Sequence, residues 1–275
     1  MGIVDFILNL AGLLLWLNWR SESADPVGKR TPATLIGTLR RADNRNRRWQ
    51  IPAAIAALIL LRALFYWQIG YAANWSARLN LSVIELSFRA AYFRHMMLFS
   101  VLSFGRTLWI FYLWLLLFSI LNGPQPFHQF VRAQLGAPDR WGRAAKLILP
   151  FAVTAPLWWL ASWLLAWMKI IPAPVSAIHR LDESLVVGLA AYLAWEIVAV
   201  ALLALYLLNS YIYFGRQPFW NYVDATAQTL LAPLNKIPLR AGKADFAPVV
   251  GMAAVFLLGG LAGRLLTFLY ARAAM

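Results

Sequence analysis

The sequence predicts an all-α, polytopic membrane protein with about six transmembrane helices. Apolar residues make up 61% of the 275-residue chain and charged residues only 13%, whereas about 25% of an ordinary soluble domain is charged. Six apolar runs approach the roughly 20 residues that cross a ~30 Å hydrocarbon core. Because backbone polar groups cannot stay unpaired in lipid, each run is expected to be a helix. The runs are 3–19, 51–70, 96–121, 146–171, 185–214 and 247–270.

A gapless duplication organises the rest of the chain. Gly-Pro-Gln-Pro-Phe at 123–127 returns as Gly-Arg-Gln-Pro-Phe at 215–219, 92 positions later, and 16 of the 53 residues in 113–165 are identical at this offset. Such self-similarity is typical of a duplicated structural unit. Each copy runs apolar helix, Gly/Pro break, amphipathic loop, proline and apolar helix. The duplication therefore predicts two helix–interfacial loop–helix hairpins, at 96–171 and 185–275.

The N-terminal membrane region, residues 1–95, precedes both copies. No basic residue precedes its first apolar run, 3–19, so an uncleaved anchor is favoured over a signal peptide. The Thr-Pro pair at 31–32 favours the start of a short basic helix. Apolar residues recur at helical spacing in 81–94, which predicts a helix lying on the outer membrane surface.

Basic residues are concentrated in alternate loops. Loops 20–50, 122–146 and 215–246 hold 16 of them, whereas the segments on the other side hold six. The positive-inside rule places the three loops in the cytoplasm, most simply at a bacterial cytoplasmic (inner) membrane. The loops are expected to contact anionic headgroups. The basic tract at 40–48 has almost no interleaved aromatic residues, so no nucleic acid is expected as a partner.

The composition excludes several kinds of chemistry. The chain has no cysteine, which rules out disulfides, thiolate nucleophiles and cysteine-ligated metals. Its three histidines, His95, His128 and His179, lack the spacing of a metal-binding helix. No nucleophile with a base is visible either, so we expect no catalytic residue, metal or cofactor. The many tryptophans leave a quinone or haem pocket as an open alternative.

Three stretches of the second copy follow a recognisable order. Gln-Pro-Phe-Trp at 217–220 opens the loop, Leu-Leu-Ala-Pro-Leu-Asn-Lys-Ile-Pro-Leu at 230–239 follows, and Ala-Asp-Phe-Ala-Pro at 244–248 leads into the last helix. With these stretches the chain resembles the YggT (YlmG) family over residues 206–275. The copy at 113–165 lacks the Leu-x-Pro-Leu centre and is a degenerate one. The positions singled out are Gln217, Pro218, Phe219, Pro233, Asp245 and Pro248.

The resemblance implies a small integral membrane protein without an established reaction. Bacterial members of the family are tied to osmotic tolerance and to cell-envelope or division processes, and plastid relatives assist cytochrome assembly and nucleoid distribution. Members often carry an arginine in the helix before the loop, where this chain has Asn209, Ser210 and Tyr211, so a role for that arginine is not carried over. The better preserved loop makes 217–248 the expected working surface.

Four ionisable residues inside the predicted spans are candidate functional or structural sites, because a charge at bilayer depth is costly. At ~1.5 Å per residue, Glu196 and Arg264 lie about 28 and 25 Å from the cytoplasmic ends of their helices. Arg106 lies at a similar height in the first copy, so Glu196 is expected to meet Arg264 or Arg106. Arg62 lies nearer the midplane. Structural pairing, snorkelling of the arginines and proton handling all stay open.

Two function classes remain after these steps. The favoured one is a non-enzymatic scaffold or accessory factor in cell-envelope, osmotic-stress or membrane-complex assembly processes. The alternative is a small-solute or ion channel or carrier that uses Glu196, Arg264 and Arg106. Other membrane proteins or a second copy of the chain are the expected protein partners. The Gly-x-x-x-Gly at 259–263 favours close helix packing, within the chain rather than between copies.

Overall fold

The computed structural model is a helical membrane protein. It describes residues 2–24, 35–73, 75–121, 126–172, 176–212, 218–234, 239–241 and 244–273. Within these ranges, six helical stretches are long and apolar enough to cross a membrane, which confirms the predicted fold class. They are Gly2–Arg20, Trp49–Gly70, Phe93–Leu121, Arg143–Trp167, Ala177–Tyr211 and Ala247–Ala273.

The chain divides into two compact units. The N-terminal unit comprises residues 1–79 and 86–109, and the C-terminal unit comprises residues 80–85 and 110–275. Helix α3 (Phe93–Leu121) contributes its first part to the N-terminal unit and its second part to the C-terminal unit. The predicted boundary after residue 95 therefore lies close to the start of this shared helix, and each unit has its own apolar clusters.

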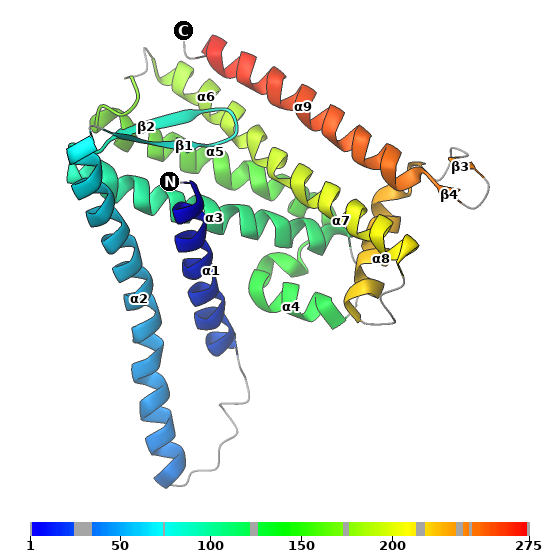
Figure 1. Ribbon diagram of the computed structural model, residues 1–275, viewed down its shortest axis with the longest axis horizontal. Coiled ribbons are helices and arrows are strands. Elements are labelled where there is room, and N and C mark those ends of the chain that lie inside the picture. The colour runs from blue at the N-terminus through cyan, green and yellow to red at the C-terminus, as the bar shows by residue number, and fades with distance from the viewer. Residues whose placement is uncertain are drawn as a thin grey trace. The chain divides into compact units, whose positions relative to one another are not determined.

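The N-terminal unit is built on two antiparallel helices, α1 (Gly2–Ala24) and α2 (Leu35–Ala73) (Figure 1). Their seam is filled by a cluster around Ile55 of α2 and Phe104 of α3. Gly12 of α1 allows this contact, since a Cβ there would come within 2.6 Å of the Phe104 ring.

Helix α2 corrects the expected short basic helix. From Leu35 the basic stretch belongs to the same 39-residue helix as the second span, and Pro52 lies inside it. At ~1.5 Å per residue the helix is about 58 Å long, nearly twice the ~30 Å hydrocarbon core. Its basic first part therefore has room to lie outside the membrane. The Thr-Pro pair at 31–32 falls outside the described residues.

Residues 81–94 do not form the predicted interfacial helix. Strands β1 (Ser76–Asn80) and β2 (Glu85–Arg89) pair instead in a two-stranded hairpin. In the turn Ser82 has a left-handed φ of 71°, and its amide donates a stabilising hydrogen bond to Asn80 Oδ1 at 2.8 Å. Leu86, Phe88 and Ala90 are buried while the residues between them are exposed. This alternation is the period of a strand with one buried face.

The C-terminal unit begins with a first helical hairpin. After α3, helix α4 (Pro126–Leu135) and a 3₁₀ turn (Ala137–Arg140) lead into α5 (Arg143–Trp167). Leu115 and Leu116 of α3 pack on Val131 and Leu135 of α4. This cluster fixes α4 against the end of the span, as expected for a short amphipathic helix at a membrane interface.

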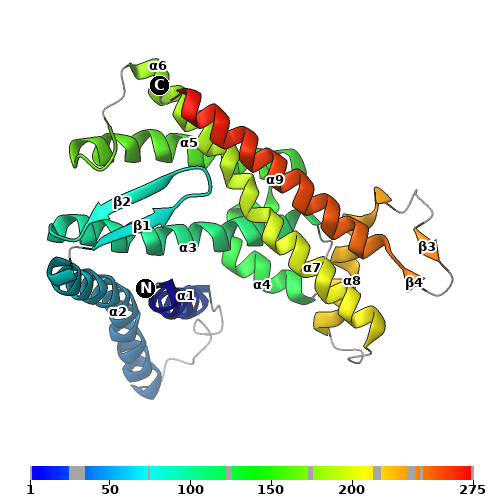
Figure 2. The same ribbon diagram turned by 45° about the horizontal axis from the view of Figure 1, so that its top comes forward.

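The second hairpin closes the unit. Helix α6 (Ala177–Ala190) continues through a 3₁₀ turn (Ala191–Leu193) into α7 (Ala194–Tyr211), where the sequence predicted one helix over 185–214. Helix α8 (Pro218–Leu231) follows, and a hairpin of β3 (Arg240–Ala241) and β4 (Ala244–Asp245) leads into α9 (Ala247–Ala273) (Figure 2). The core of this hairpin consists of Leu203, Ala227, Leu231 and Ala247.

Helices α7 and α9 lie side by side in both views (Figures 1 and 2). Their close approach is at Gly259, where a Cβ would collide with the carboxylate of Glu196, and at Gly251, where a Cβ would come within 3.2 Å of Leu203. The packing of Gly259 inside the chain confirms the expected role of this glycine.

Candidate functional site

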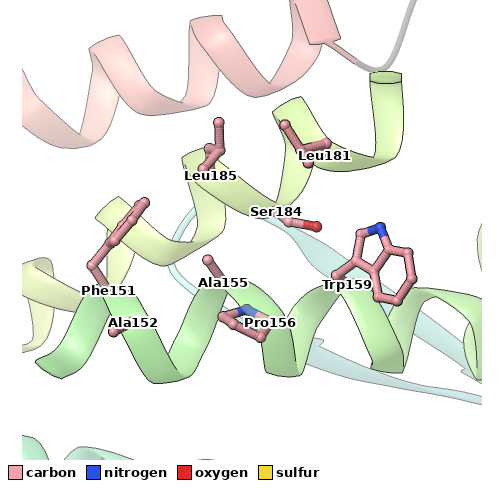
Figure 3. Close-up of a pocket in the computed structure, with 8 residues that line it drawn as sticks. All are labelled: Phe151, Ala152, Ala155, Pro156, Trp159, Leu181, Ser184 and Leu185. Atoms are coloured by element: carbon pink, nitrogen blue, oxygen red, sulfur yellow. The ribbon is translucent and has the colours of Figure 1, made fainter. Parts of the chain in front are cut away.

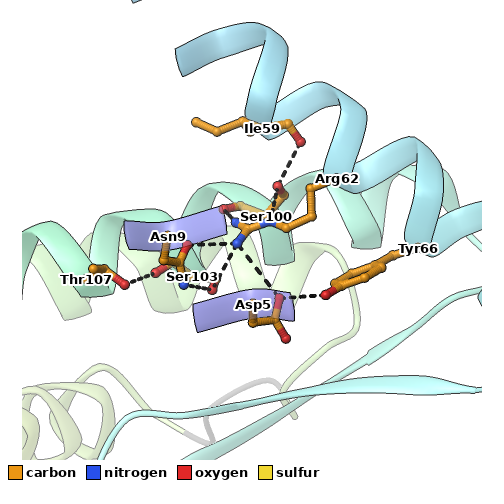
Figure 4. Close-up of polar contacts among 8 residues, drawn as sticks. All are labelled: Asp5, Asn9, Ile59, Arg62, Tyr66, Ser100, Ser103 and Thr107. Carbon is orange, nitrogen blue, oxygen red and sulfur yellow. Dashed lines mark hydrogen bonds and ion pairs between the residues drawn. The ribbon is translucent and has the colours of Figure 1, made fainter. Parts of the chain in front are cut away.

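A buried arginine organises the polar interior of the N-terminal unit. Arg62 of α2 is 2% exposed. Its Nε donates to Ser100 Oγ at 2.8 Å, and its Nη1 donates to Asn9 Oδ1 at 2.8 Å. Nη2 donates to the carbonyl oxygen of Ser100 (Figure 4). The guanidinium therefore bonds to both α1 and α3 from a position on α2.

Asp5 supplies the negative charge of this site. Its Oδ1 lies 3.8 Å from Arg62 Nη1 and accepts a 2.9 Å hydrogen bond from the hydroxyl of Tyr66, a fully buried residue. Figure 4 shows the other carboxylate oxygen pointing away from both partners. One carboxylate oxygen of Asp5 thus interacts with both Arg62 and Tyr66, and the other interacts with neither.

Helical spacing on three helices creates the site. Asp5 and Asn9 lie four residues apart on α1, and Arg62 and Tyr66 lie four apart on α2, so each pair shares one helix face. Helix α3 adds hydroxyls at 100, 103 and 107: Ser100 Oγ donates to the carbonyl of Ile59, and Ser103 Oγ accepts from Asn9 Nδ2 at 3.0 Å. We call this set the Arg62 cluster; it consists of Asp5, Asn9, Arg62, Tyr66, Ser100, Ser103 and Thr107.

Burial determines what the Arg62 cluster can do. Breaking a buried ion pair by removing one partner typically costs about 3–5 kcal/mol, because the remaining charge is left uncompensated. Polar bonds between membrane helices contribute about 0.6–2 kcal/mol each. With five oxygen partners around one guanidinium, the cluster is a strong tie between α1, α2 and α3.

A cavity of about 430 Å³ borders the Arg62 cluster within the N-terminal unit. Asp5 belongs to both, and the aromatic rings of Trp75 and Phe99 form part of the wall beside the polar side chains of Ser76 and Arg78. The volume falls in the range of small-molecule sites, ~300–1,000 Å³. The cavity has a carboxylate, a cation and aromatic surface, the groups that would orient a small polar ligand.

A second buried ion cluster lies in the first hairpin of the C-terminal unit. The Asp139 side chain, 1% exposed, lies 3.0 Å from Arg132 Nε and 3.8 Å from Lys146 Nζ. Ser119 Oγ donates to Asp139 Oδ1 at 2.6 Å and accepts from Lys146 Nζ at 2.7 Å. The cluster ties the end of α3 to the start of α5. Sequence reasoning missed it, although Asp139 is the only acidic residue of that loop.

The predicted pairing of Glu196 with Arg264 is not formed. Among the described residues no ion pair joins them; the Glu196 carboxylate packs over Gly259, and Arg264 is exposed on α9. The reason is geometric, since Arg264 lies five residues after Gly259 and about 140° further around the helix. Arg106 is also exposed, on the part of α3 in the N-terminal unit.

The loop residues singled out by the resemblance have mostly local roles. Pro218 begins α8, and Pro233 lies in the turn after it. Asp245 Oδ1 accepts from the amide of Ala247 at 3.0 Å and so caps α9, whose second residue is the buried Pro248. Phe219 is 44% exposed. Gln217 lies outside the described residues.

No group of three or more His, Asp or Glu side chains is placed to hold a metal ion in the part of the chain that the structure describes. Comparisons with known proteins add no assignment: no family model, no curated protein and no solved structure matches this chain.

Proposed function

We propose that this chain is a non-enzymatic integral membrane protein that acts as a scaffold or accessory factor in cell-envelope, osmotic-stress or membrane-complex assembly processes. The observation that carries the proposal is that its buried ion pairs are closed inside the protein. Arg62 pairs with Asp5, and Lys146 pairs with Asp139. Charges used in this way hold helices in register and present no reactive or translocating group.

The proposed setting is the bacterial cytoplasmic membrane, with loops 20–50, 122–146 and 215–246 on the cytoplasmic side. The surplus of basic residues in these loops supports the orientation, and anionic headgroups are their proposed partners. Large apolar side chains remain exposed on the spans, including Leu257 and Leu258 of α9 at 68% each. Contact with lipid accounts for such exposure.

The proposed scaffold is a duplicated pair of hairpins in parallel orientation, of which the second is YggT-like and the first is degenerate. Both short helices, α4 and α8, begin at the proline of the repeated phrase. At the offset of 92, Val131 corresponds to Val223 and Leu135 to Ala227, and all four are buried. Equivalent residues thus fill equivalent cores, which supports a common origin of the hairpins.

A reciprocal tryptophan contact supports the parallel arrangement. Trp114 Nε1 donates to the carbonyl of Ala194 at 2.9 Å, and Trp195 Nε1 donates to the carbonyl of Leu113 at 2.9 Å. Leu117, three residues after Trp114, packs on Val198, three residues after Trp195. Contacts that advance together along both helices are those of parallel neighbours, so α3 and α7 run in the same direction.

The hypothesis that the protein is a channel or carrier has less support. It depended on a charge pair between Glu196 and an arginine, and Glu196 packs on Gly259 rather than on Arg264. A transport path through inverted repeats would also favour discontinuous helices at the midplane, whereas the backbone at the α6–α7 junction stays right-handed helical at Ala191 and Ala194. We therefore propose no transported solute.

Photocrosslinking in native membranes tests the scaffold proposal. A photoreactive residue in place of Gln228, exposed on α8, samples the proposed working surface. The matched control replaces Leu258, which faces away from the core of α9. We expect discrete protein adducts, to another membrane protein or to a second copy, from position 228 and only lipid adducts from 258. Equal adduct patterns from both positions would contradict a dedicated docking surface.

A further inference from the structure

An apolar groove runs along the seam between α5 and α6. It encloses about 370 Å³ between Phe151, Pro156 and Trp159 of α5 and Leu181, Ser184 and Leu185 of α6 (Figure 3). One end is closed where the helices touch, since a Cβ on Gly188 would come within 2.8 Å of Ala155 and 2.9 Å of Phe151. From there to Trp159 the groove follows α5 for eight residues, about 12 Å.

Arg180 lies at the other end of the seam. It is 8% exposed, on the same face of α6 as Ser184, whose hydroxyl donates to the Arg180 carbonyl at 2.6 Å. Its guanidinium carbon stands 4.1 Å from the centre of the Trp163 ring, and Trp163 contacts Trp159 of the groove. A guanidinium held in place by an aromatic stack therefore lies just beyond the Trp159 end of the groove.

This guanidinium forms no close ion pair in the described part of the protein, although the charge of Glu183 is near enough to interact with it. Its buried Nε has no hydrogen-bond acceptor, and Glu183, three residues further on, forms no ion pair with it. A buried charge without a counter-ion is costly. Arg62 and Lys146, the other buried arginine and lysine among the described residues, both have carboxylate partners. The exception at Arg180 points to an anion supplied from outside the chain.

We propose that the α5–α6 groove is a phospholipid site, in which one acyl chain fills the groove and the phosphate binds Arg180. The planar guanidinium matches a phosphate through paired hydrogen bonds. Arg180 lies only three residues after the start of α6, so it stands near a helix end, at headgroup level, while the groove descends toward the membrane interior. Trp159 and Trp163 suit the same interfacial level.

The arrangement of an apolar groove next to a buried guanidinium favours a lipid over a free anion. A phosphate ion would use Arg180 but leave the groove below it empty, and a neutral lipid would fill the groove but leave the guanidinium Nε without an acceptor. A phospholipid satisfies both at once. This inference does not depend on the scaffold role, because it concerns what the C-terminal unit binds rather than what it assembles.

The test uses photoactivatable lipids with the full-length protein in vesicles. A phosphatidylglycerol with a diazirine on one acyl chain is expected to label α5 and α6 peptides. Arg180→Gln should reduce this labelling about tenfold, because hydrogen bonds to a charged group are lost, and Arg180→Lys should retain part of it. Ala152→Trp fills the groove and should also abolish labelling. Arg264→Gln and Val153→Trp, outside the site, are the matched controls.

Two further arms identify the ligand. Diacylglycerol with the same photoactive chain should label the groove weakly, and excess inorganic phosphate should not displace the phospholipid. Equal labelling by diacylglycerol and phospholipid, or unchanged labelling in both Arg180→Gln and Ala152→Trp, would overturn the proposal, since bulk lipid would then explain it. Displacement by inorganic phosphate would also overturn it. Thermal unfolding of each variant verifies that folding is retained.

Discussion

At the scale of single residues, a few buried ion pairs join helices of this protein. Arg62 was visible in the sequence as an ionisable residue within a span, but its partners were not. Asp5 and Asn9 belong to a helix 53 or more positions away in the chain, and nothing in local spacing says which helices will meet. The polar faces on α1, α2 and α3 could be predicted, but their convergence could not.

Removing the guanidinium tests the Arg62 cluster. Arg62→Gln leaves the Asp5 carboxylate without its cation and is expected to lower the free energy of unfolding by about 3 kcal/mol. The double variant Asp5→Asn, Arg62→Gln should regain part of that loss. Arg106→Gln, an exposed arginine on α3, serves as control and should change stability by less than about 1 kcal/mol. Thermal unfolding in detergent measures all three; equal effects of Arg62→Gln and Arg106→Gln would refute the role.

The Asp139 cluster makes a similar prediction with a different control. Asp139→Leu introduces the residue that stands at the equivalent position, 231, of the second hairpin. It leaves the charge of Lys146, whose side chain is 8% exposed, without its carboxylate partner. We expect a loss of about 3 kcal/mol. Removing that charge as well, in Asp139→Leu with Lys146→Met, should be less damaging than Asp139→Leu alone. Arg132→Gln, a 64% exposed partner, should cost at most about 1 kcal/mol.

At the scale of elements, most helices follow from apolar length, and the errors are informative. Residues 81–94, which include β2, were predicted to be a helix because Leu81, Ile84 and Phe88 lie at helical spacing. The pattern that indicates a strand is the strict alternation of apolar and polar residues through Leu86, Phe88 and Ala90, which a helix does not require. The start of α9 at Ala247 was predicted correctly, since the Asp-x-Ala-Pro order supplies both the cap and a tolerated proline.

Adjacent glycines on α9 provide a test of the α7–α9 contact. Gly259→Ala drives a Cβ into the Glu196 side chain, whereas a Cβ on Gly260 meets nothing within 4 Å. Gly259→Leu is expected to destabilise the protein by more than about 1 kcal/mol, because the two helices must separate. Gly260→Ala should be neutral or stabilising by up to about 1 kcal/mol through helix propensity. Thermal unfolding distinguishes them; a smaller effect at 259 than at 260 would contradict this packing.

At the scale of the whole molecule, the fold class was predictable because hydrocarbon thickness and backbone bonding leave few alternatives. Function was not predictable to the same degree, since a scaffold needs no diagnostic constellation of residues. The pairing of Glu196 with an arginine was inferred from helix height alone, and height does not fix the direction in which Arg264 points. Rotation about the helix axis decides such contacts, and it depends on packing.

Cysteine labelling tests the proposed orientation, and the absence of native cysteine makes it simple. Arg45→Cys, Arg140→Cys and Arg240→Cys each place one thiol in a basic loop. In intact cells an impermeant maleimide should leave all three unlabelled, and permeabilisation should expose them. Ser87→Cys, in an exposed position of β2, is the control for the other side and should be labelled without permeabilisation. Labelling of the loop positions from outside would reverse the orientation.

The central claim, that the buried ion pairs of Arg62 and Lys146 tie helices together and serve no transport path, is tested most directly by flux into proteoliposomes. Purified protein is reconstituted, and proton and potassium permeability are compared with those of empty vesicles of the same composition. Our account predicts equal permeability in both, and no change on Glu196→Gln. Flux above that of empty vesicles, abolished by Glu196→Gln, would contradict the scaffold proposal and restore the channel or carrier alternative.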